Sequence, residues 1–379
     1  MAKVEFAGAS RVQELSCASG TAGSWARYLT ALLADGPRAY ADNADVDIEA
    51  LLVDGTLLPL VLSRGGESAA ESCSPRSHYV AYSLEEAAKR HPGLPPWLFS
   101  VGAAAATPLI RAAGIDRVIS INNWLLSTNP SVRLDLEQVR EVTACLTRKY
   151  PDRAILWRSL NPKLDAALIE HARLCGYRLL RSRRVYMLDA GPWVYRRHQN
   201  ARRDFALLKR TRFEAISDPE ALAPHAERIA ELFRSLYLGK HSRLNTAFNA
   251  RFFAVTLAAG VFEYRAFRVD GEVAAFLAFF IRDQVMTASL VGYDLKLPQS
   301  LGLYRLCLAT FLAEAASRGL RLNLSSGADE FKRLRGGLPV DEYEAVYDRH
   351  LAWTRRAGWF ALSSLSRAAG AAKAFNASV

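Results

Sequence analysis

The segment that most constrains the fold is a run of three apolar stretches joined by two short turns, residues 263–294, EYRAFRVDGEVAAFLAFFIRDQVMTASLVGYD. The first turn is Asp270-Gly271, and Asp-Gly between apolar stretches is a strong hairpin signal because both residues tolerate positive φ. The pattern predicts an antiparallel meander of three strands. A helix over about 301–318 and a strand, RLNLS (321–325), follow. This order of elements predicts an α+β fold.

The first half of the chain has a similar order of elements. Two apolar runs within residues 47–63, joined by Asp54-Gly55, predict another hairpin. The remaining elements expected there are strands at 117–121, 153–159 and 177–189 and helices at 133–148 and 162–175. The similar order suggests duplication of one α+β unit. We expect domains at 1–195 and 196–351, followed by a helical tail at 352–379.

Size and charge agree with two units and suggest an anionic ligand. The chain has 379 residues, of which 50% are hydrophobic, and single cores rarely grow beyond about 300 residues. The net charge is +11, with basic residues clustered at 178–186 and 195–212. A basic cleft would attract a polyanion or a phosphorylated cofactor, although a solvated Arg-rich face explains the clusters equally well.

Several classes of function lack their usual sequence signatures. The five cysteines are scattered and never spaced as C-x-x-C, so neither zinc nor a disulfide framework is expected. No leader with an apolar core and no run of about 18 apolar residues is present, so we expect a cytoplasmic protein without a membrane span. The sequence also lacks a Ser-His-Asp order, an H-E-x-x-H motif, a Walker loop and a Rossmann fingerprint. The sequence gives no indication of the oligomeric state.

The loop before the predicted helix of the second half is a candidate anion site. Its residues, PQSLGLY (298–304), place Gly302 next to the start of the helix. A helix N-terminus presents unpaired N–H groups and the positive end of the helix dipole, and Gly lets a ligand approach the backbone closely. The alternative is an ordinary helix start with Ser300 as its N-cap.

This arrangement resembles the GNAT acyltransferase fold, in which the pyrophosphate of acyl-CoA lies on the turn after the fourth strand. The usual signature of that turn is Arg/Gln-x-x-Gly-x-Gly/Ala. Gln299 and Gly302 match its first two positions, whereas Tyr304 stands at the last. The donor-binding residues that the resemblance implies are Leu290, Val291, Gln299, Ser300, Leu301, Gly302, Leu303 and Tyr304.

The stretch NLSSGADEFKRL (323–334) is similar to an element of FemAB-like proteins, a branch that contains tandem GNAT units. Gly327, Phe331 and Lys332 match its Gly-x-x-x-Phe/Tyr-Lys pattern, whereas Asn323-Leu324 replaces the usual Asp-Phe. The segments 236–253 and NNWLLSTNP also look like elements of that branch. The resemblance implies two tandem GNAT-like domains, each a mixed, mainly antiparallel sheet flanked by helices, with the first a degenerate copy.

The resemblance implies transfer of an acyl group to an amine, without a metal. FemAB-like proteins form amide bonds from aminoacyl-tRNA or from acyl-CoA. Backbone N–H groups around Leu290–Tyr293 would stabilise the oxyanion, each donor contributing on the order of 3 kcal/mol. We expect acyl-CoA as the donor and a small-molecule amine as the acceptor. The alternatives are an aminoacyl-tRNA-dependent transferase and a non-catalytic polyanion-binding protein on a GNAT scaffold.

Three residues are candidate catalytic groups. The resemblance places Lys332 near the reacting acyl ester, where a cation would offset developing charge. Asp294 and Tyr293 end the fourth strand of the unit and are candidates for base or proton donor. The alternatives are a solvated turn lysine beside Arg333 and Arg335 and an ordinary strand-end aspartate.

A second group of residues is a candidate acceptor site. Lys240, His241 and Asn245 form a polar cluster after an apolar helix, although such clusters are commonly helix caps. Arg158, at the end of a strand, could bind a carboxylate or form a structural ion pair. Asn323 and Ser325, on the strand before Lys332, complete the expected substrate-binding set.

Overall fold

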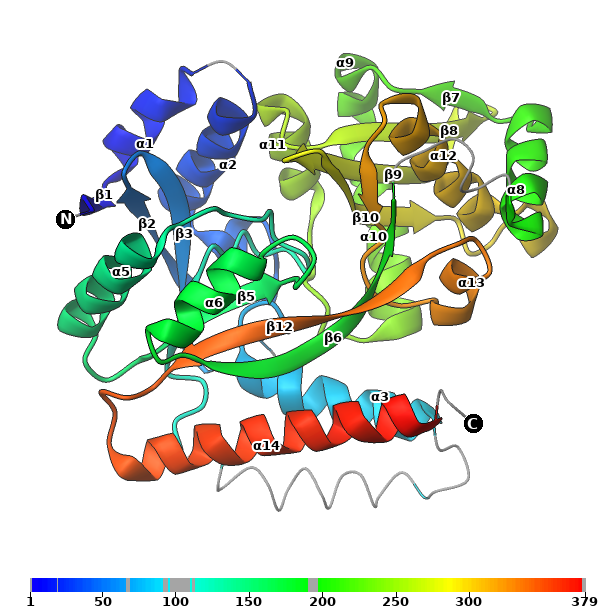
Figure 1. Ribbon diagram of the computed structural model, residues 1–379. Coiled ribbons are helices and arrows are strands. Elements are labelled where there is room, and N and C mark those ends of the chain that lie inside the picture. Colours follow the sequence, from blue (N-terminus) through cyan, green and yellow to red (C-terminus); the bar gives the residue numbers. More distant parts are fainter. Residues whose placement is uncertain are drawn as a thin grey trace.

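In the computed structural model, the described residues are 2–18, 20–65, 69–90, 95, 110, 113–189 and 197–376. Their strands form a single twelve-stranded sheet that runs through both halves of the chain (Figure 1). The strands are β1 (Val4–Ala7), β2 (Val46–Val53), β3 (Thr56–Ser63), β4 (Val118–Ile121), β5 (Ala154–Leu160), β6 (Arg178–Leu188), β7 (Glu214–Ile216), β8 (Glu263–Val269), β9 (Glu272–Arg282), β10 (Val285–Tyr293), β11 (Arg321–Asn323) and β12 (Leu338–Tyr347).

Helices flank this sheet. They are α1 (Ala9–Ser16), α2 (Thr21–Asp35), α3 (Tyr82–Arg90), α5 (Leu136–Lys149), α6 (Ala166–Leu174), α8 (Gln199–Arg210), α9 (Pro219–Leu222), α10 (Ala226–Arg234), α11 (Ala250–Ala259), α12 (Leu303–Ser317), α13 (Asp329–Arg333) and α14 (Trp353–Asn376). The short turns that matter for the site are η2 (Ser77–Ala81), η4 (Ser235–His241) and η5 (Gln299–Leu301).

The strand order across the sheet is β1-β2-β3-β4-β5-β12-β6-β11-β10-β9-β8-β7. The two edges are equivalent, because β7 to β12 occupy the same positions counted from one edge as β1 to β6 occupy counted from the other. Each half supplies an antiparallel run of four strands whose last member pairs in parallel with a fifth, β4 with β5 and β10 with β11. The sixth strands are exchanged, because β12 pairs with β5 and β6 pairs with β11. The duplication expected from the sequence is therefore confirmed, with β6 and β12 side by side at the centre (Figure 1).

The expected hairpins are confirmed at both Asp-Gly turns. Asp54 and Gly55 have φ values of 46° and 83°, and Asp270 and Gly271 have 50° and 83°, so all four lie in the left-handed region that the turn requires. The last strand of the chain, β12, begins at Leu338 and ends at Tyr347. The expected domain boundary after residue 195 lies outside the described residues.

The helices bury their apolar faces on both sides of the sheet. In the second half, α12 covers one face of the sheet. Leu306 and Phe311 of α12 pack against Phe279 of β9 and Met286 of β10. The opposite face packs against α2, α10 and α11 through a separate cluster that joins the two halves. Helix α14 lies alongside β6, beside α3 in Figure 1, and buries Trp359 completely. Among the described residues, no helix has the length and apolarity needed to cross a bilayer.

Candidate functional site

The parallel strands β10 and β11 separate part of the way along β10. Residues Val285–Thr287 pair with Arg321–Asn323, but β10 continues to Tyr293. A register shift between Ala288 and Leu290 places a bulge at Ser289. Beyond the bulge, the edge of β10 that faced β11 has no strand partner among the described residues, so its N–H and C=O groups are not committed to a neighbouring strand. The predicted donor residues Leu290 and Val291 lie on this edge.

Lys332 lies in α13, just after β11, with only 4% of its surface exposed. Its Nζ donates to the carbonyl oxygens of Ser325 at 3.2 Å and Ser326 at 2.6 Å. Burial lowers the pKa of Lys332 to about 7. The nearby charge of Arg183 also lowers this pKa, whereas that of Asp329 raises it. The two carbonyl acceptors favour the ammonium form and act against this shift. The solvated-turn alternative is therefore wrong, and the catalytic role of Lys332 stays a prediction.

The two arginines that follow Lys332 differ from one another. Arg333 is exposed. Arg335 is buried, and its guanidinium lies 3.3 Å from the centre of the Phe331 ring and 2.5 Å from Asp204 Oδ2. Arg333 is therefore the suitable surface control for a Lys332 variant, whereas Arg335 belongs to the core.

The loop predicted to bind phosphate has the expected left-handed glycine at the helix start. Gly302 has φ +66° and is the N-cap of α12, so the alternative with Ser300 as N-cap is wrong. Helix α8 crosses this turn: a Cβ added at Gly302 would lie 2.7 Å from Leu207 Cδ2. Asp204 of α8 lies 2.6 Å from Arg305 Nε. The close neighbour of the turn is therefore α8, while Gln299 and Ser300 remain exposed.

The departure from the family signature at Tyr304 has a packing explanation. The Tyr304 ring lies 4.9 Å from the Phe331 ring and 6.0 Å from the Tyr293 ring. Burial is the main cause that raises the pKa of Tyr304 well above its ordinary value, and the nearby Tyr237 adds to it, so the phenol stays neutral. Tyr304 thus connects the start of α12 to α13 and to the end of β10, where Gly or Ala would leave this space empty.

Asp294 is held as an ion pair. Its carboxylate accepts from Arg228 at 2.6 Å and from the Lys296 backbone N–H at 2.8 Å. Although partial burial raises the pKa of Asp294, these two donors lower it overall. A carboxylate paired in this way is a weak proton acceptor, so the geometry favours the structural alternative for Asp294.

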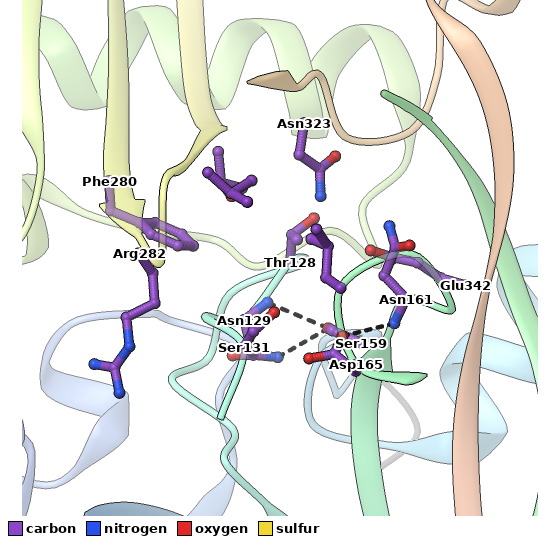
Figure 2. Close-up of a pocket in the computed structure, with 13 residues that line it drawn as sticks. Thr128, Asn129, Ser131, Ser159, Asn161, Asp165, Phe280, Arg282, Asn323 and Glu342 are labelled. Carbon is purple, nitrogen blue, oxygen red and sulfur yellow. Dashed lines mark hydrogen bonds between the residues drawn. The ribbon is translucent and has the colours of Figure 1, made fainter. Parts of the chain in front are cut away.

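A narrow polar hollow lies where the two halves meet. Its cavity is about 10 Å³, room for about one water molecule. Figure 2 shows side chains from both halves facing it, whereas Arg282 points away. The residues that line it are Thr128, Asn129, Ser131, Ser159, Asn161, Leu164, Asp165, Phe280, Arg282, Val285, Thr287, Asn323 and Glu342. Thr287 and Asn323 are also the last paired residues of β10 and β11, so the hollow lies next to the point where these strands separate.

Two carboxyl groups of the hollow have unusual surroundings. Burial raises the pKa of Asp165 to about 6, against the Asn161 backbone N–H that donates to it. Glu342 is 1% exposed, and its Oε2 accepts from Arg183 at 2.9 Å. Its Oε1 has no hydrogen-bond partner among the described residues. An unpartnered buried carboxylate oxygen beside a cavity is a ready acceptor for a bound N–H group.

Of the other residues predicted to bind substrate, some lie at or near the hollow and some lie away from it. Asn323 lines the hollow, and Ser325 Oγ lies 3.0 Å from Thr128 Oγ1 of the first half. Arg158 is buried and lies 2.8 Å from Glu344, so it forms the structural ion pair of the alternative prediction.

The polar cluster of Lys240, His241 and Asn245 lies at the end of η4 and in the turn that follows it. Asn245 Nδ2 donates to the carbonyl oxygens of Tyr237 and Ser242, both at 3.0 Å, and so closes this turn. Lys240 and His241 are exposed. Neither they nor Asn245 lines the polar hollow. Their role in acceptor binding stays a prediction.

Sequence reasoning did not single out Asp165, Glu342 or Thr128. Asp165 and Thr128 follow first-half strands, so the expectation of a degenerate first half directed attention away from them. In the sequence, Glu342 has no feature beyond its place in a strand. It reaches the hollow because β12 pairs with β6 at the centre of the sheet. The signal that was available is the pair of polar loops after β4 and β5, STNP and SLNPKLD, both at strand ends. No cluster of His, Cys, Asp and Glu in the described part of the chain could hold a metal ion.

Comparisons with known proteins agree on the fold. A family model described as "Acetyltransferase (GNAT) domain" matches residues 194–333. The solved structure of FemX is 8% identical, with a TM-score of 0.52 over 91% of this chain and 97% of that chain. A search of curated proteins gave no match.

Two further solved structures are similar at lower scores. L-PGS from Bacillus licheniformis is 13% identical over 61% of this chain and 77% of that chain, with a TM-score of 0.43. A tandem GNAT protein from the clavulanic acid biosynthesis pathway is 12% identical over 92% of this chain and 98% of that chain, with a TM-score of 0.39.

Proposed function

We propose that the chain, whose residues 194–333 match the GNAT acetyltransferase domain model and whose sheet is built from two tandem units, is an N-acyltransferase that moves an acyl group from acyl-CoA to an amine. The observation that carries the proposal is the separation of β10 from β11 beyond a bulge, with Lys332 buried in the turn after β11. An opened parallel pair of this kind offers backbone donors to an extended thioester and to the oxyanion formed from it.

The donor phosphates would lie at the start of α12. There the first N–H groups of the helix have no intrahelical partner, and the helix dipole is positive. Nearby, α8 presents exposed basic side chains that can receive an anionic group. They are Arg202, Arg203, Lys209 and Arg210.

The acceptor amine would lie in the polar hollow. Glu342 Oε1 is a free acceptor for an amine N–H, and Asn323 and Thr128 add polar contacts. The hollow has room for a group no larger than about one water molecule, so the acceptor must enter with its amine end first. The narrow hollow favours a primary amine at the end of an extended molecule over a bulky secondary amine.

In the proposed reaction the amine nitrogen attacks the thioester carbonyl carbon, and the N–H groups of β10 beyond the bulge stabilise the oxyanion. Asp165, whose pKa is raised to about 6, is largely ionised at neutral pH and accepts the proton that the amine loses. Collapse of the tetrahedral intermediate forms the amide and expels the CoA thiolate, which is then protonated. Lys332 lies next to the β11 turn, where its charge offsets that of the oxyanion.

Thermal shift measurements with acetyl-CoA, CoA and unacylated tRNA test the donor. A ligand at 100 times its Kd stabilises the folded state by about 2.7 kcal/mol, so a true donor gives a clear rise in melting temperature. We expect acetyl-CoA and CoA to stabilise the protein. Stabilisation by tRNA alone, lost as salt increases, would reject acyl-CoA as donor.

Acyl transfer to a panel of primary amines, followed by mass spectrometry, tests the site. We expect Lys332→Met and Asp165→Asn each to lower transfer by roughly 10²-fold or more. The matched controls are Arg333→Met and Asp283→Asn, which alter exposed side chains, and both should retain transfer. Equal losses in variants and controls would show that the site lies elsewhere.

A second candidate function is aminoacyl transfer from aminoacyl-tRNA. The observation that favours it is the exposed basic face of α8 beside the start of α12, where four cationic side chains can contact successive phosphates of a nucleic-acid backbone. A tRNA donor predicts a steep fall of affinity with salt, and a weaker salt dependence after Arg202→Ala and Arg203→Ala. Transfer from acetyl-CoA with no tRNA affinity would reject this candidate.

A further inference from the structure

A serine, a histidine and a glutamate lie in hydrogen-bonded order outside the proposed transfer site. Ser182 Oγ lies 2.8 Å from His78 Nε2, and His78 Nδ1 lies 2.7 Å from Glu71 Oε2. Both ring nitrogens of the histidine are therefore engaged, one by a hydroxyl and the other by a carboxylate. A nucleophile, a base and a group that orients the base have this arrangement in serine hydrolases on unrelated folds.

The protonation states follow from the contacts. Burial raises the pKa of Glu71, but His78, Arg158 and Arg183 lower it to about 2, so the carboxylate is ionised. Glu71 Oε1 also accepts from Ser127 Oγ at 3.2 Å. An ionised carboxylate can only accept hydrogen bonds, so His78 Nδ1 carries a proton. In the neutral imidazole Nε2 is then the free base, and it faces Ser182 Oγ.

The backbone of β6 directs the serine toward the histidine. Arg183 pairs with Glu342 and Arg181 pairs with Tyr343, so Ser182 is the extra residue of a β-bulge. A bulge redirects a side chain and is frequent next to active sites. Ser182 is half-buried rather than enclosed, and His78 lies in the π-helical turn η2, a distortion also found often at functional sites.

We propose that Ser182, His78 and Glu71 form a second reactive site, in which Ser182 is a nucleophile for ester or thioester carbonyls. Ser182 Oγ attacks the carbonyl carbon while its proton passes to His78 Nε2. The intermediate then expels an alcohol or thiol, which takes that proton, and the acyl group remains on Ser182 Oγ. Water, deprotonated by His78, releases the acid and restores the serine. Arg183 is the adjacent cation on the bulge and offsets the charge of the intermediate.

The inference does not depend on the proposed acyl transfer, because Ser182, His78 and Glu71 take no part in it; Arg183, which also holds Glu342, is the residue that lies between the two sites. The sequence shows no Ser-His-Asp order for two reasons. The acid is a glutamate, and the three residues occur as Glu71, His78 and Ser182, with more than a hundred residues between histidine and serine.

Labelling of the full chain with an alkyl fluorophosphonate tests the proposal. The serine oxygen displaces fluoride from the phosphorus of the probe and forms a phosphorus–oxygen bond, while the proton of the serine hydroxyl passes to the histidine. We expect one adduct, located by peptide mass spectrometry on Ser182, and no adduct in Ser182→Ala. Absence of an adduct on Ser182 in the wild-type chain would overturn the proposal.

The role of the histidine is tested by rate. His78→Gln keeps a polar side chain of similar size, and we expect labelling at least roughly 10²-fold slower. The matched control is His350→Gln, since His350 Nε2 lies 2.8 Å from the backbone carbonyl oxygen of Arg153 and contacts no hydroxyl among the described residues. Melting temperatures establish that each variant is folded. A folded His78→Gln that labels at the wild-type rate would show that the hydrogen-bonded chain is structural.

Discussion

Replacement of Lys332 by methionine gives the sharpest test of how the candidate site is built. Methionine keeps the length and apolar stem of the side chain but removes the titrating amine. The carbonyl oxygens of Ser325 and Ser326 lose their donor, which costs the variant a constant amount of stability. The informative quantity is therefore how the difference in unfolding free energy between wild type and variant changes with pH.

The sign and size follow from the lowered pKa. The pKa of Lys332 falls from 10.5 to about 7 on folding, chiefly through burial. Between these values the unfolded chain binds the proton that the folded chain has released, so wild-type stability rises with pH. The penalty for a buried ammonium is fully present below pH 7 and disappears above pH 10.5. From pH 6 to pH 9.5 the gain is roughly 3 kcal/mol, at 1.36 kcal/mol per unit, and the two carbonyl acceptors reduce it to roughly 2–3 kcal/mol.

Urea unfolding at pH 6, 7.5 and 9.5, followed by circular dichroism, measures this difference. We expect wild type to gain roughly 2–3 kcal/mol relative to Lys332→Met across the range. Arg333→Met is the control, since an exposed side chain should give a constant difference. If the wild type and Lys332→Met curves stay parallel at all three pH values, Lys332 keeps an ordinary pKa in the fold, and the lowering of its pKa by burial is wrong.

Two further predictions concern the packing of α8 on the start of α12. Gly302→Ala places a Cβ 2.7 Å from Leu207 Cδ2 at a φ of +66°, so we expect the free energy of unfolding in urea to fall by roughly 1–3 kcal/mol. The double variant Gly302→Ala, Leu207→Ala should lose less stability than the sum of the two single variants. Additive losses would contradict the contact. Asp204→Asn removes the charge between Arg305 and Arg335, so we expect a loss of roughly 3 kcal/mol and a lower melting temperature. An unchanged melting temperature would show that the charge of Asp204 contributes little.

Elements with local signals were predictable from the sequence. The Asp-Gly hairpins and the helices α5 and α12 formed near their expected bounds, because turn chemistry and apolar spacing act over a few residues. The tandem architecture was predictable from the repeated order of elements. The exchange of β6 and β12 was not, because strand pairing between distant segments depends on the packing of both halves together.

Burial of charged residues was not predictable from the sequence. A solvated turn was the alternative prediction for Lys332 beside Arg333 and Arg335, yet Lys332 and Arg335 are both enclosed. The acceptors of Lys332 are carbonyls of its own turn, and the partner of Arg335 is Asp204, on a helix more than a hundred residues away. Sequence spacing reports only neighbours along the chain, so a charge that is buried by a distant partner looks the same as a solvated one.

The strand exchange changes how the first half should be regarded. A degenerate copy would serve only as a support, but Thr128 and Asp165 reach the polar hollow from first-half loops. Glu342, on β12, reaches it because that strand lies between β5 and β6, where Arg183 holds its carboxylate. Each half thus places side chains beside strands of the other. Because the hollow and the opened β10–β11 pair share Thr287 and Asn323, acceptor and donor would meet only when both halves are folded together.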